Sequence, residues 1–315
     1  MLNKQTAQTI VQTIQGNHAY IPSHSIPFIT DNAVGYIPVT HLPVYEQRAE
    51  FRLNDKLGVL RFAPDVQGFD AKTAAMNAVT DDLIQAGLIK ASTEPHFQER
   101  AVGGTDRLTN PEFKINRAYF RHYGFSADGV FLMGVIVNPA TDDKTIRLQQ
   151  RSGRVEFAHQ YDFIAGGAVK YPQTVNDALQ TQIKEETGVK APESQYIGQT
   201  SFMFSTPDKN WVTSLSHHLF LTEMEQIDIG SFDKSEVQGF ADFTPAQVIE
   251  LAANGQFAGQ NVQGLMTAMI VADVFPTFEG SSLIVAEVAK HYQPSAPEFT
   301  IQPEKQSAPQ QKLIP

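Results

Sequence analysis

Residues 161–189 constrain the fold of this chain more than any other segment, because a strand-like stretch there runs through a glycine pair and a loop into a helix. The apolar spacing predicts the helix over 175–187, and a glycine follows as its stop. At about 100° per residue, Gln182, Glu185 and Glu186 fall within one sector of this helix. The sequence therefore predicts a strand, a loop and a helix with three oxygen-bearing side chains on one face.

Two adjacent carboxylates on one helical face repel each other unless a positive charge lies between them. Glu185 and Glu186 are hard oxygen ligands of the kind that suit Mg²⁺ or Mn²⁺. A bound cation of that kind neutralises a phosphate and activates a water molecule. The alternative interpretation of the same pair is a solvated helix face with no ligand, and the pair alone does not decide between them.

The segment from Gly167 to Val189 resembles the Nudix box, Gly-x5-Glu-x7-Arg-Glu-U-x-Glu-Glu-x-Gly-U, where U is a bulky aliphatic residue. The positions that match, besides the two ends, are Ile183, Glu185, Glu186 and Gly188. Three positions depart from the pattern, namely Gln173 for the first glutamate, Thr181 for the arginine and Gln182 for the glutamate after it.

The flanking sequence resembles the Nudix subgroup that is associated with thiamine pyrophosphokinase, over about residues 30–275. In that subgroup an N-terminal domain precedes three features: an Arg-Ser-x-x-basic strand end, an aspartate before the glycine pair, and a later acidic residue followed by valine. The residues of this chain that fit these features are Arg151, Ser152, Arg154, Asp162, Glu236 and Val237.

The resemblance implies Mg²⁺- or Mn²⁺-dependent hydrolysis of a small-molecule diphosphate, either thiamine diphosphate-like or a nucleoside diphosphate linked to another moiety. The metal ligands that it implies are the Gly166 carbonyl, Gln182, Glu185 and Glu186, and the implied catalytic residues are Glu186 and Glu236. The residues that it implies for substrate binding are Arg151, Arg154 and Asp162. Glu236 has an equally good alternative interpretation as an exposed turn residue, and each arginine as a solvated surface charge.

The departures from the box differ in their expected effect. Gln173 and Thr181 replace a glutamate and an arginine that commonly pair, and losing both avoids stranding one charge. Gln182 replaces an anionic ligand with a neutral amide, so we expect weaker metal binding and modest activity. A Nudix-fold module that binds a ligand or a partner without catalysis is therefore the alternative function.

A metal-independent hydrolase built on His217 and His218 is a third and weaker possibility. Adjacent residues of a strand point to opposite faces of its sheet, so these two histidines cannot serve one site. Trp211, the single tryptophan, either stacks on a ligand ring or packs in the interior.

Composition excludes several other classes of protein. The chain has 34 acidic against 24 basic residues and a formal charge of −10, which argues against non-specific binding of nucleic acid. It has no cysteine, so disulfides, iron–sulfur clusters and thiol nucleophiles are excluded. No signal peptide and no apolar stretch of membrane-spanning length is evident, so we expect a cytoplasmic protein without a membrane partner. The oligomeric state is not predictable from the sequence.

We predict an α/β protein in which a smaller N-terminal α+β domain precedes an α/β/α Nudix sandwich. The domain bounds are 1–112 and 113–292, followed by a disordered Pro- and Gln-rich tail, 293–315. Strands are predicted over 130–138, 145–152, 201–205 and 216–224, and helices over 245–255 and 261–275. Asp70 is the predicted cap of an N-terminal helix, and an amphipathic helix is expected before Gly16.

Overall fold

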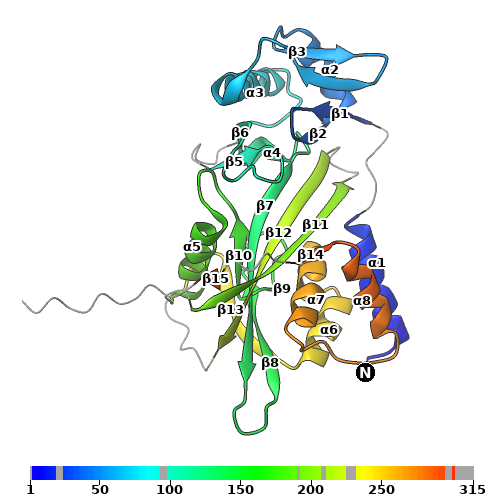
Figure 1. Cartoon of the computed structure of the whole chain (residues 1–315), viewed down its shortest axis with the longest axis vertical. Coiled ribbons are helices and arrows are strands. Elements are labelled where there is room, and N and C mark those ends of the chain that lie inside the picture. Colours follow the sequence, from blue (N-terminus) through cyan, green and yellow to red (C-terminus); the bar gives the residue numbers. More distant parts are fainter. Residues whose placement is uncertain are drawn as a thin grey trace, which may run out of the picture.

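The structure of the chain is a computed structural model that describes residues 2–18, 24–92, 98–189, 192–206, 211–224, 232–294 and 300–301. In this described part, a large mixed sheet has helices on both faces, and a smaller four-stranded sheet lies at one end of the molecule (Figure 1). This arrangement confirms the predicted α/β class.

The large sheet has the strand order β13-β8-β7-β12-β11-β14, with β9 beside β8, β10 beside β7 and β15 beside β11. Its strands are β7 (Ser126–Val137), β8 (Lys144–Arg151), β9 (Tyr161–Asp162), β10 (Ala165–Ala168), β11 (Ser194–Thr206), β12 (Trp211–Met224), β13 (Val237–Phe243), β14 (Tyr292–Pro294) and β15 (Thr300–Ile301). The four strands predicted in this region are confirmed as β7, β8, β11 and β12, each longer or shifted by a few residues.

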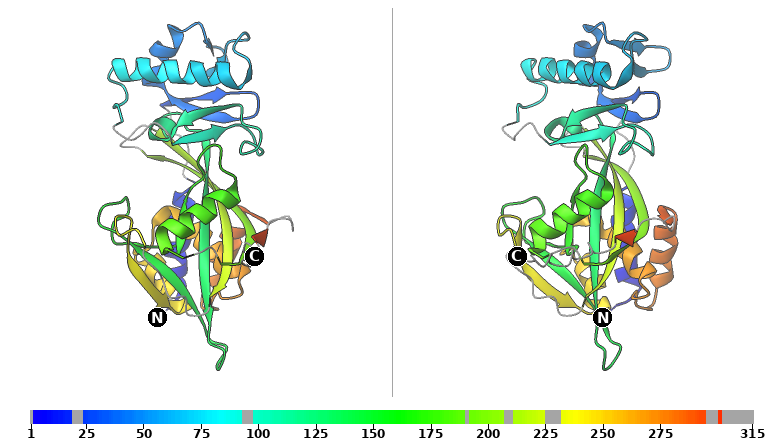
Figure 2. Two further views of the ribbon diagram at one scale, coloured as in Figure 1. Left: turned by 90° about the vertical axis from the view of Figure 1, so that its left-hand side faces the viewer. Right: turned by 60° about the vertical axis from the view of Figure 1, so that its left-hand side comes forward.

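Helices cover the two faces of the large sheet unequally. Helix α5 (Val175–Thr187) packs on one face through an apolar cluster that includes Leu179 and Ile183. The opposite face is covered by α1 (Lys4–Gly16), η3 (Gly259–Asn261), α6 (Pro245–Ala253), α7 (Val262–Val271) and α8 (Ser281–Ala289). The views in Figure 2 show α5 alone on its side of the sheet.

Helix α1 belongs to the core of the large sheet although it opens the chain. Its buried residues Ala7, Ile10 and Ile14 lie in the same apolar cluster as α6, α7 and α8. Figure 1 shows α1, in dark blue, beside α8 in orange. The helix expected before Gly16 is confirmed, and its amphipathic face is buried against the far end of the chain.

The N-terminal lobe has its own apolar core, made by a four-stranded sheet, helix α3 and a two-stranded ribbon. Its elements are β1 (Ser25–Ile29), β2 (Val34–Pro38), η1 (Val39–His41), α2 (Leu42–Glu46), β3 (Phe51–Asn54), β4 (Val59–Phe62), α3 (Gly68–Gln85), β5 (Glu99–Val102), β6 (Phe113–Asn116) and α4 (Arg117–Phe120). Aromatic residues beyond the predicted boundary at 112, such as Phe113, Tyr123 and Phe125, are buried in this core. The boundary itself stays a prediction.

Two local predictions differ from the structure. Gln67 is the N-cap of α3, and Asp70 lies in its first turn, where a carboxylate still stabilises the helix through its dipole. The tail predicted to be disordered from residue 293 contributes strands at 292–294 and 300–301, both paired with β11. The rest of that tail lies outside the described residues. None of the helices described here is long and apolar enough to cross a membrane.

Candidate functional site

A cavity of about 370 Å³ lies where one edge of β7 changes its pairing partner. Residues 134–137 of β7 pair with β8, whereas residues 129–132 pair with β10. Because β12 occupies the other edge of β7, β8 and β10 must diverge from one edge and leave a space between them. The Nudix-box helix α5 follows β10 and reaches back to this space.

Local sequence signals fix the position of α5 at both ends. Thr174 and Asp177 form a reciprocal capping box at the N-terminus, with hydrogen bonds of 3.1 Å between each side chain and the other's backbone N–H. Gly188 ends the helix in the left-handed conformation with φ 69°, which glycine adopts without strain. The helix therefore has the predicted bounds, 175–187, and its last turn carries Gln182, Glu185 and Glu186 to the cavity.

Glu186 is the buried acid of the site, with 4% of its surface exposed. Its Oε2 atom accepts hydrogen bonds of 2.9 Å from the Gly166 backbone N–H and from Gln149 Nε2. Burial raises the pKa of the Glu186 carboxyl to about 8, and the carboxylates of Asp162 and Glu236 act in the same direction against the two hydrogen bonds. Burial and the negative neighbours therefore favour the protonated, neutral form of the Glu186 carboxyl when no cation is bound beside it.

Gln182 and Glu185 contact each other at the same helix end. Gln182 Nε2 donates a 3.4 Å hydrogen bond to Glu185 Oε2. The Gln182 side chain covers Gly167 so closely that a Cβ atom there would lie 2.1 Å from Gln182 Oε1. A side chain at position 167 would therefore displace the Gln182 amide. In a full Nudix box residues 182 and 185 would both carry carboxylates, whereas here an amide proton lies between the two side chains.

Arg151 and Asp162 form a partly buried pair on the β8 side of the cavity. Asp162 Oδ2 accepts 2.9 Å from Arg151 Nη1, and its Oδ1 accepts from Asn261 Nδ2 at 2.8 Å and from the Phe163 N–H at 2.9 Å. Burial raises the pKa of the Asp162 carboxyl, although Arg151 and the hydrogen bonds oppose this effect. With both of its oxygens engaged, Asp162 positions Arg151 and leaves contact with a ligand to the arginine.

The loop before β13 brings Glu236 to the rim of the cavity. Asp233 N donates to the Glu185 carbonyl at 3.1 Å and Ser152 N donates to the Glu236 carbonyl at 2.9 Å, so the loop is attached both to α5 and to the end of β8. The Glu236 side chain is exposed and lines the cavity. Arg154, in contrast, is exposed on the turn after β8 and does not line it.

The sequence reasoning missed most of the basic side of the cavity. Besides Arg151, the basic residues that line it are Arg100, Arg117, Arg121 and Lys170. The three new arginines come from β5 and α4, in a region without a recognisable motif. The cavity also contains Gln149, which could have been predicted from the sequence. It lies two residues before Arg151, and strand periodicity places both residues on one face of β8.

The other departures of the box are accommodated as a neutral pair. Gln173 Nε2 donates to Thr181 Oγ1 at 3.3 Å, in the positions where the box has glutamate and arginine. No charge is stranded by the exchange.

The two histidines of β12 occupy opposite faces, as predicted. His217 lines the cavity and is buried, which lowers the pKa of its imidazole to about 3. His218 contacts Asp128 Oδ1 at 2.9 Å and Tyr196 at 3.2 Å. They do not form one catalytic group.

Comparison with known proteins agrees with this geometry. Residues 131–262, somewhat less than half of the chain, match the family model described as NUDIX domain, which spans both sides of the cavity at β7, β8, α5 and η3. The match identifies a Nudix domain within the chain. No curated protein sequence matches the chain.

Several solved structures are also similar in part. A MutT/nudix family protein from Enterococcus faecalis is 20% identical, with a TM-score of 0.30, over 38% of this chain and 43% of that one. DR0079 from Deinococcus radiodurans is 17% identical, with a TM-score of 0.36, over 57% and 100%. The NUDIX domain of Shewanella oneidensis NrtR, complexed with ADP ribose, is 13% identical, with a TM-score of 0.36, over 46% and 87%. Since these scores are below 0.5, we base the function on the family match and the site itself.

Proposed function

We propose that this protein is a metal-dependent hydrolase that cleaves the diphosphate linkage of a small organic diphosphate. The observation that carries the proposal is the bipolar cavity, in which the acidic end of α5 faces several basic side chains across about 370 Å³. A diphosphate fits such a cavity because its oxygens can contact a cation at one end and guanidinium groups at the other. The flanking resemblance favours a thiamine diphosphate-like compound over other diphosphates.

The donor atoms of the cavity fit one hard divalent cation, Mg²⁺ or Mn²⁺, although only two of the three side chains that would hold it carry a carboxylate. Glu185 and Glu186 supply carboxylates, and Gln182 supplies an amide oxygen. Beside Glu186, the buried Oε1 atom of Gln149 has no hydrogen-bond partner in the described part of the chain, which a cation or its water would provide. No group of three or more His, Cys, Asp or Glu side chains that could hold a metal occurs among the described residues, so we expect weaker binding than in a full box.

Four side chains of the cavity have a task in the proposed reaction. The cation, when bound, neutralises phosphate oxygens and lowers the pKa of a water molecule. Glu236, exposed at the rim, accepts the proton of the attacking water, and Arg151, oriented by Asp162, binds a phosphate oxygen. Glu186 stays fixed by Gly166 and Gln149, and its burial excludes bulk water from that end of the site.

A specific observation supports the alternative, a Nudix-fold module that binds its ligand without turnover. The hydrogen bond from Gln182 to Glu185 satisfies the helix end with a neutral amide, so these residues do not require a cation in order to be stable. In that case the basic side of the cavity binds a phosphorylated ligand and the acidic side is only structural.

A screen of diphosphate compounds with Mg²⁺ and with Mn²⁺, read as release of phosphate or monophosphate, separates the two functions. For a hydrolase we expect turnover that depends on metal and is lost in Glu186→Gln. The matched control is Glu279→Gln, which changes an exposed glutamate outside the cavity and should keep full activity. Ligand binding without turnover under any metal would favour the module and refute the hydrolase.

A further inference from the structure

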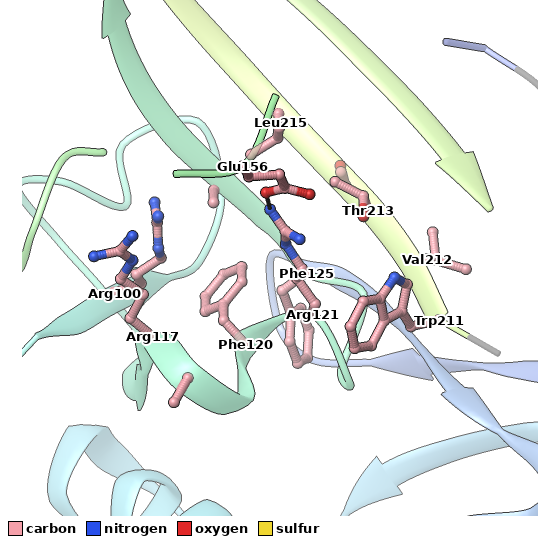
Figure 3. Close-up of a pocket in the computed structure, with 13 residues that line it drawn as sticks. Arg100, Arg117, Phe120, Arg121, Phe125, Glu156, Trp211, Val212, Thr213 and Leu215 are labelled. Carbon is pink, nitrogen blue, oxygen red and sulfur yellow. Dashed lines mark hydrogen bonds and ion pairs between the residues drawn. The ribbon is translucent and has the colours of Figure 1, made fainter. Parts of the chain in front are cut away.

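A second cavity, of about 320 Å³, continues from the first toward the N-terminal lobe. The two cavities share five lining residues, which are Arg100, Arg117, Arg121, Glu156 and Leu215. The two cavities therefore adjoin each other along these side chains. Figure 3 shows the second cavity, with Trp211 at one end and Arg100 and Arg117 at the other.

Alternate residues of β12 form a continuous floor under both cavities. Trp211, Thr213 and Leu215 line the second cavity, and Leu215 and His217 line the first. Residues two apart in a strand share a face, and six residues of strand span about 20 Å. A ligand that reaches from the level of His217 to Trp211 is therefore much longer than a diphosphate group alone.

Two of the three shared arginines have no carboxylate partner in the described part of the chain. Arg100 Nη1 donates to the Asp128 backbone carbonyl at 3.2 Å, and Arg117 donates to the Gln98 side-chain carbonyl. Arg121 is different, since it pairs with Glu156 at 3.3 Å. Burial and the neighbouring Arg117 and Arg121 lower the pKa of the Arg100 guanidinium to about 10, although the Asp128 carboxylate acts in the opposite direction.

Aromatic rings flank these arginines. The Arg100 guanidinium lies 5.8 Å from the centre of the Phe120 ring, and the Arg121 guanidinium 6.0 Å from that of Trp211. Trp211 is only partly buried although it lines the cavity, so part of its ring remains accessible to a ligand. Cations next to aromatic surfaces suit a ligand that combines an anionic group with a flat ring.

We propose that the second cavity binds an aromatic or heteroaromatic ring of the substrate at Trp211, while Arg100 and Arg117 hold the phosphate that is farther from α5. This inference rests on the proposed function for the diphosphate itself, and it adds the part of the structure that binds the ring of the substrate. The preferred compound carries a flat ring joined to its diphosphate by a linker. Inorganic pyrophosphate and purely aliphatic diphosphates leave the second cavity without a ring and bind more weakly.

The single tryptophan of the chain makes the ring-binding step directly observable. We would titrate the full-length protein in EDTA with thiamine diphosphate and with ADP, and follow tryptophan emission. A saturable change is expected for both compounds, and none for inorganic pyrophosphate or isopentenyl diphosphate. A change that grows linearly without saturating is collisional, and it would overturn the proposal.

Calorimetric titration of variants tests the individual contacts. Trp211→Leu should weaken binding of the ring-bearing diphosphates about tenfold, whereas Trp211→Phe should stay within about threefold of the wild type. Arg117→Gln should weaken binding of these diphosphates about tenfold or more. The Arg117 side chain is exposed, so its loss does not threaten folding. Arg61→Gln, an exposed arginine on β4 outside both cavities, is the matched control. Equal affinities of Arg117→Gln and Arg61→Gln, or of Trp211→Leu and the wild type, would refute the assignment.

These measurements keep the failure of this inference apart from the failure of the proposed function. Saturable binding at Trp211 without turnover under Mg²⁺ or Mn²⁺ would refute the hydrolase and support the ring site. Turnover without any ring-dependent change in tryptophan emission would support the hydrolase and refute the ring site. Glu186→Gln should retain the emission change in EDTA even where it abolishes turnover.

Discussion

The substitution Gln182→Glu tests how far the missing negative charge at the end of α5 limits metal binding and turnover by this protein. In the wild type, the Gln182 amide donates a 3.4 Å hydrogen bond to Glu185. In the variant two carboxylates face each other, one on the buried residue 182 and one on the exposed Glu185, which costs about 1 kcal/mol in a water-like dielectric and about 4 kcal/mol in that of a protein surface. The lost hydrogen bond costs roughly 1 kcal/mol more. We therefore expect the metal-free variant to be about 2–5 kcal/mol less stable toward unfolding than the wild type.

Mg²⁺ should reduce this difference, because the added carboxylate becomes a ligand. Each tenfold gain in affinity adds about 1.4 kcal/mol of stability when the metal is saturating. The assay is chemical denaturation in EDTA and in excess Mg²⁺, together with turnover of a diphosphate. Gln180→Glu, exposed and about 200° away around the same helix, is the matched control for charge alone. If both variants respond equally to Mg²⁺, residue 182 does not face a metal site and the reasoning fails.

Two further predictions concern the framework of the site. Asp128→Asn should destabilise the protein by about 3–5 kcal/mol, since the buried Arg107 guanidinium, 2.7 Å from Asp128, loses its counter-ion; a loss below about 1 kcal/mol in denaturation would contradict this. Burial would raise the pKa of the Asp128 carboxyl, but His218 and Arg107 outweigh it and hold the pKa below 3.8. The stabilisation that Asp128 contributes is thus complete above pH 3.8 and is lost as the pH falls through the lower, folded-state value, so the variant should lack this part of the acid dependence. Gln173→Glu combined with Thr181→Arg should show a favourable coupling of up to about 1 kcal/mol in a double-mutant cycle; strictly additive effects would mean that the two side chains do not meet.

The sequence predicted helix α5 at its observed bounds because the signals that define it are local. A side-chain cap, an apolar stripe and a terminal glycine all lie within fifteen residues. Helix α8 (Ser281–Ala289) was not predicted, and it lacks such signals, since its N-cap Gly280 makes no side-chain hydrogen bond. The packing of α1 against α8 could not be predicted from the sequence either, because periodicity shows that a helix has a buried face and does not show what covers it.

The candidate site also has one half that local sequence defines and one half that only tertiary packing creates. Its acidic half lies on one helix and one glycine pair, so spacing alone brings Gln182, Glu185 and Glu186 together. Its basic half is tertiary, because Arg100 and Arg117 reach the cavity only through the docking of the N-terminal lobe on the ends of the central strands β7 and β12. No period of strand or helix relates either arginine to the box, and a family pattern limited to the box omits them.

The charge distribution of the cavity suggests what kind of catalyst it is. Relative to a full Nudix box, the helix end has lost one anionic group, at Gln182, while the opposite wall carries Arg100 and Arg117 without carboxylate partners among the described residues. If the proposed function is right, affinity for a diphosphate is thereby shifted from a metal to fixed guanidinium groups. A guanidinium group that contacts only a non-reacting phosphate binds the ground state and the transition state about equally, which lowers KM without raising kcat. We therefore expect a protein that retains its diphosphate ligand in EDTA and turns it over slowly with Mg²⁺, so that chelation should reduce kcat far more than affinity. Loss of ligand binding on chelation would instead place the metal at the centre of recognition and contradict this account.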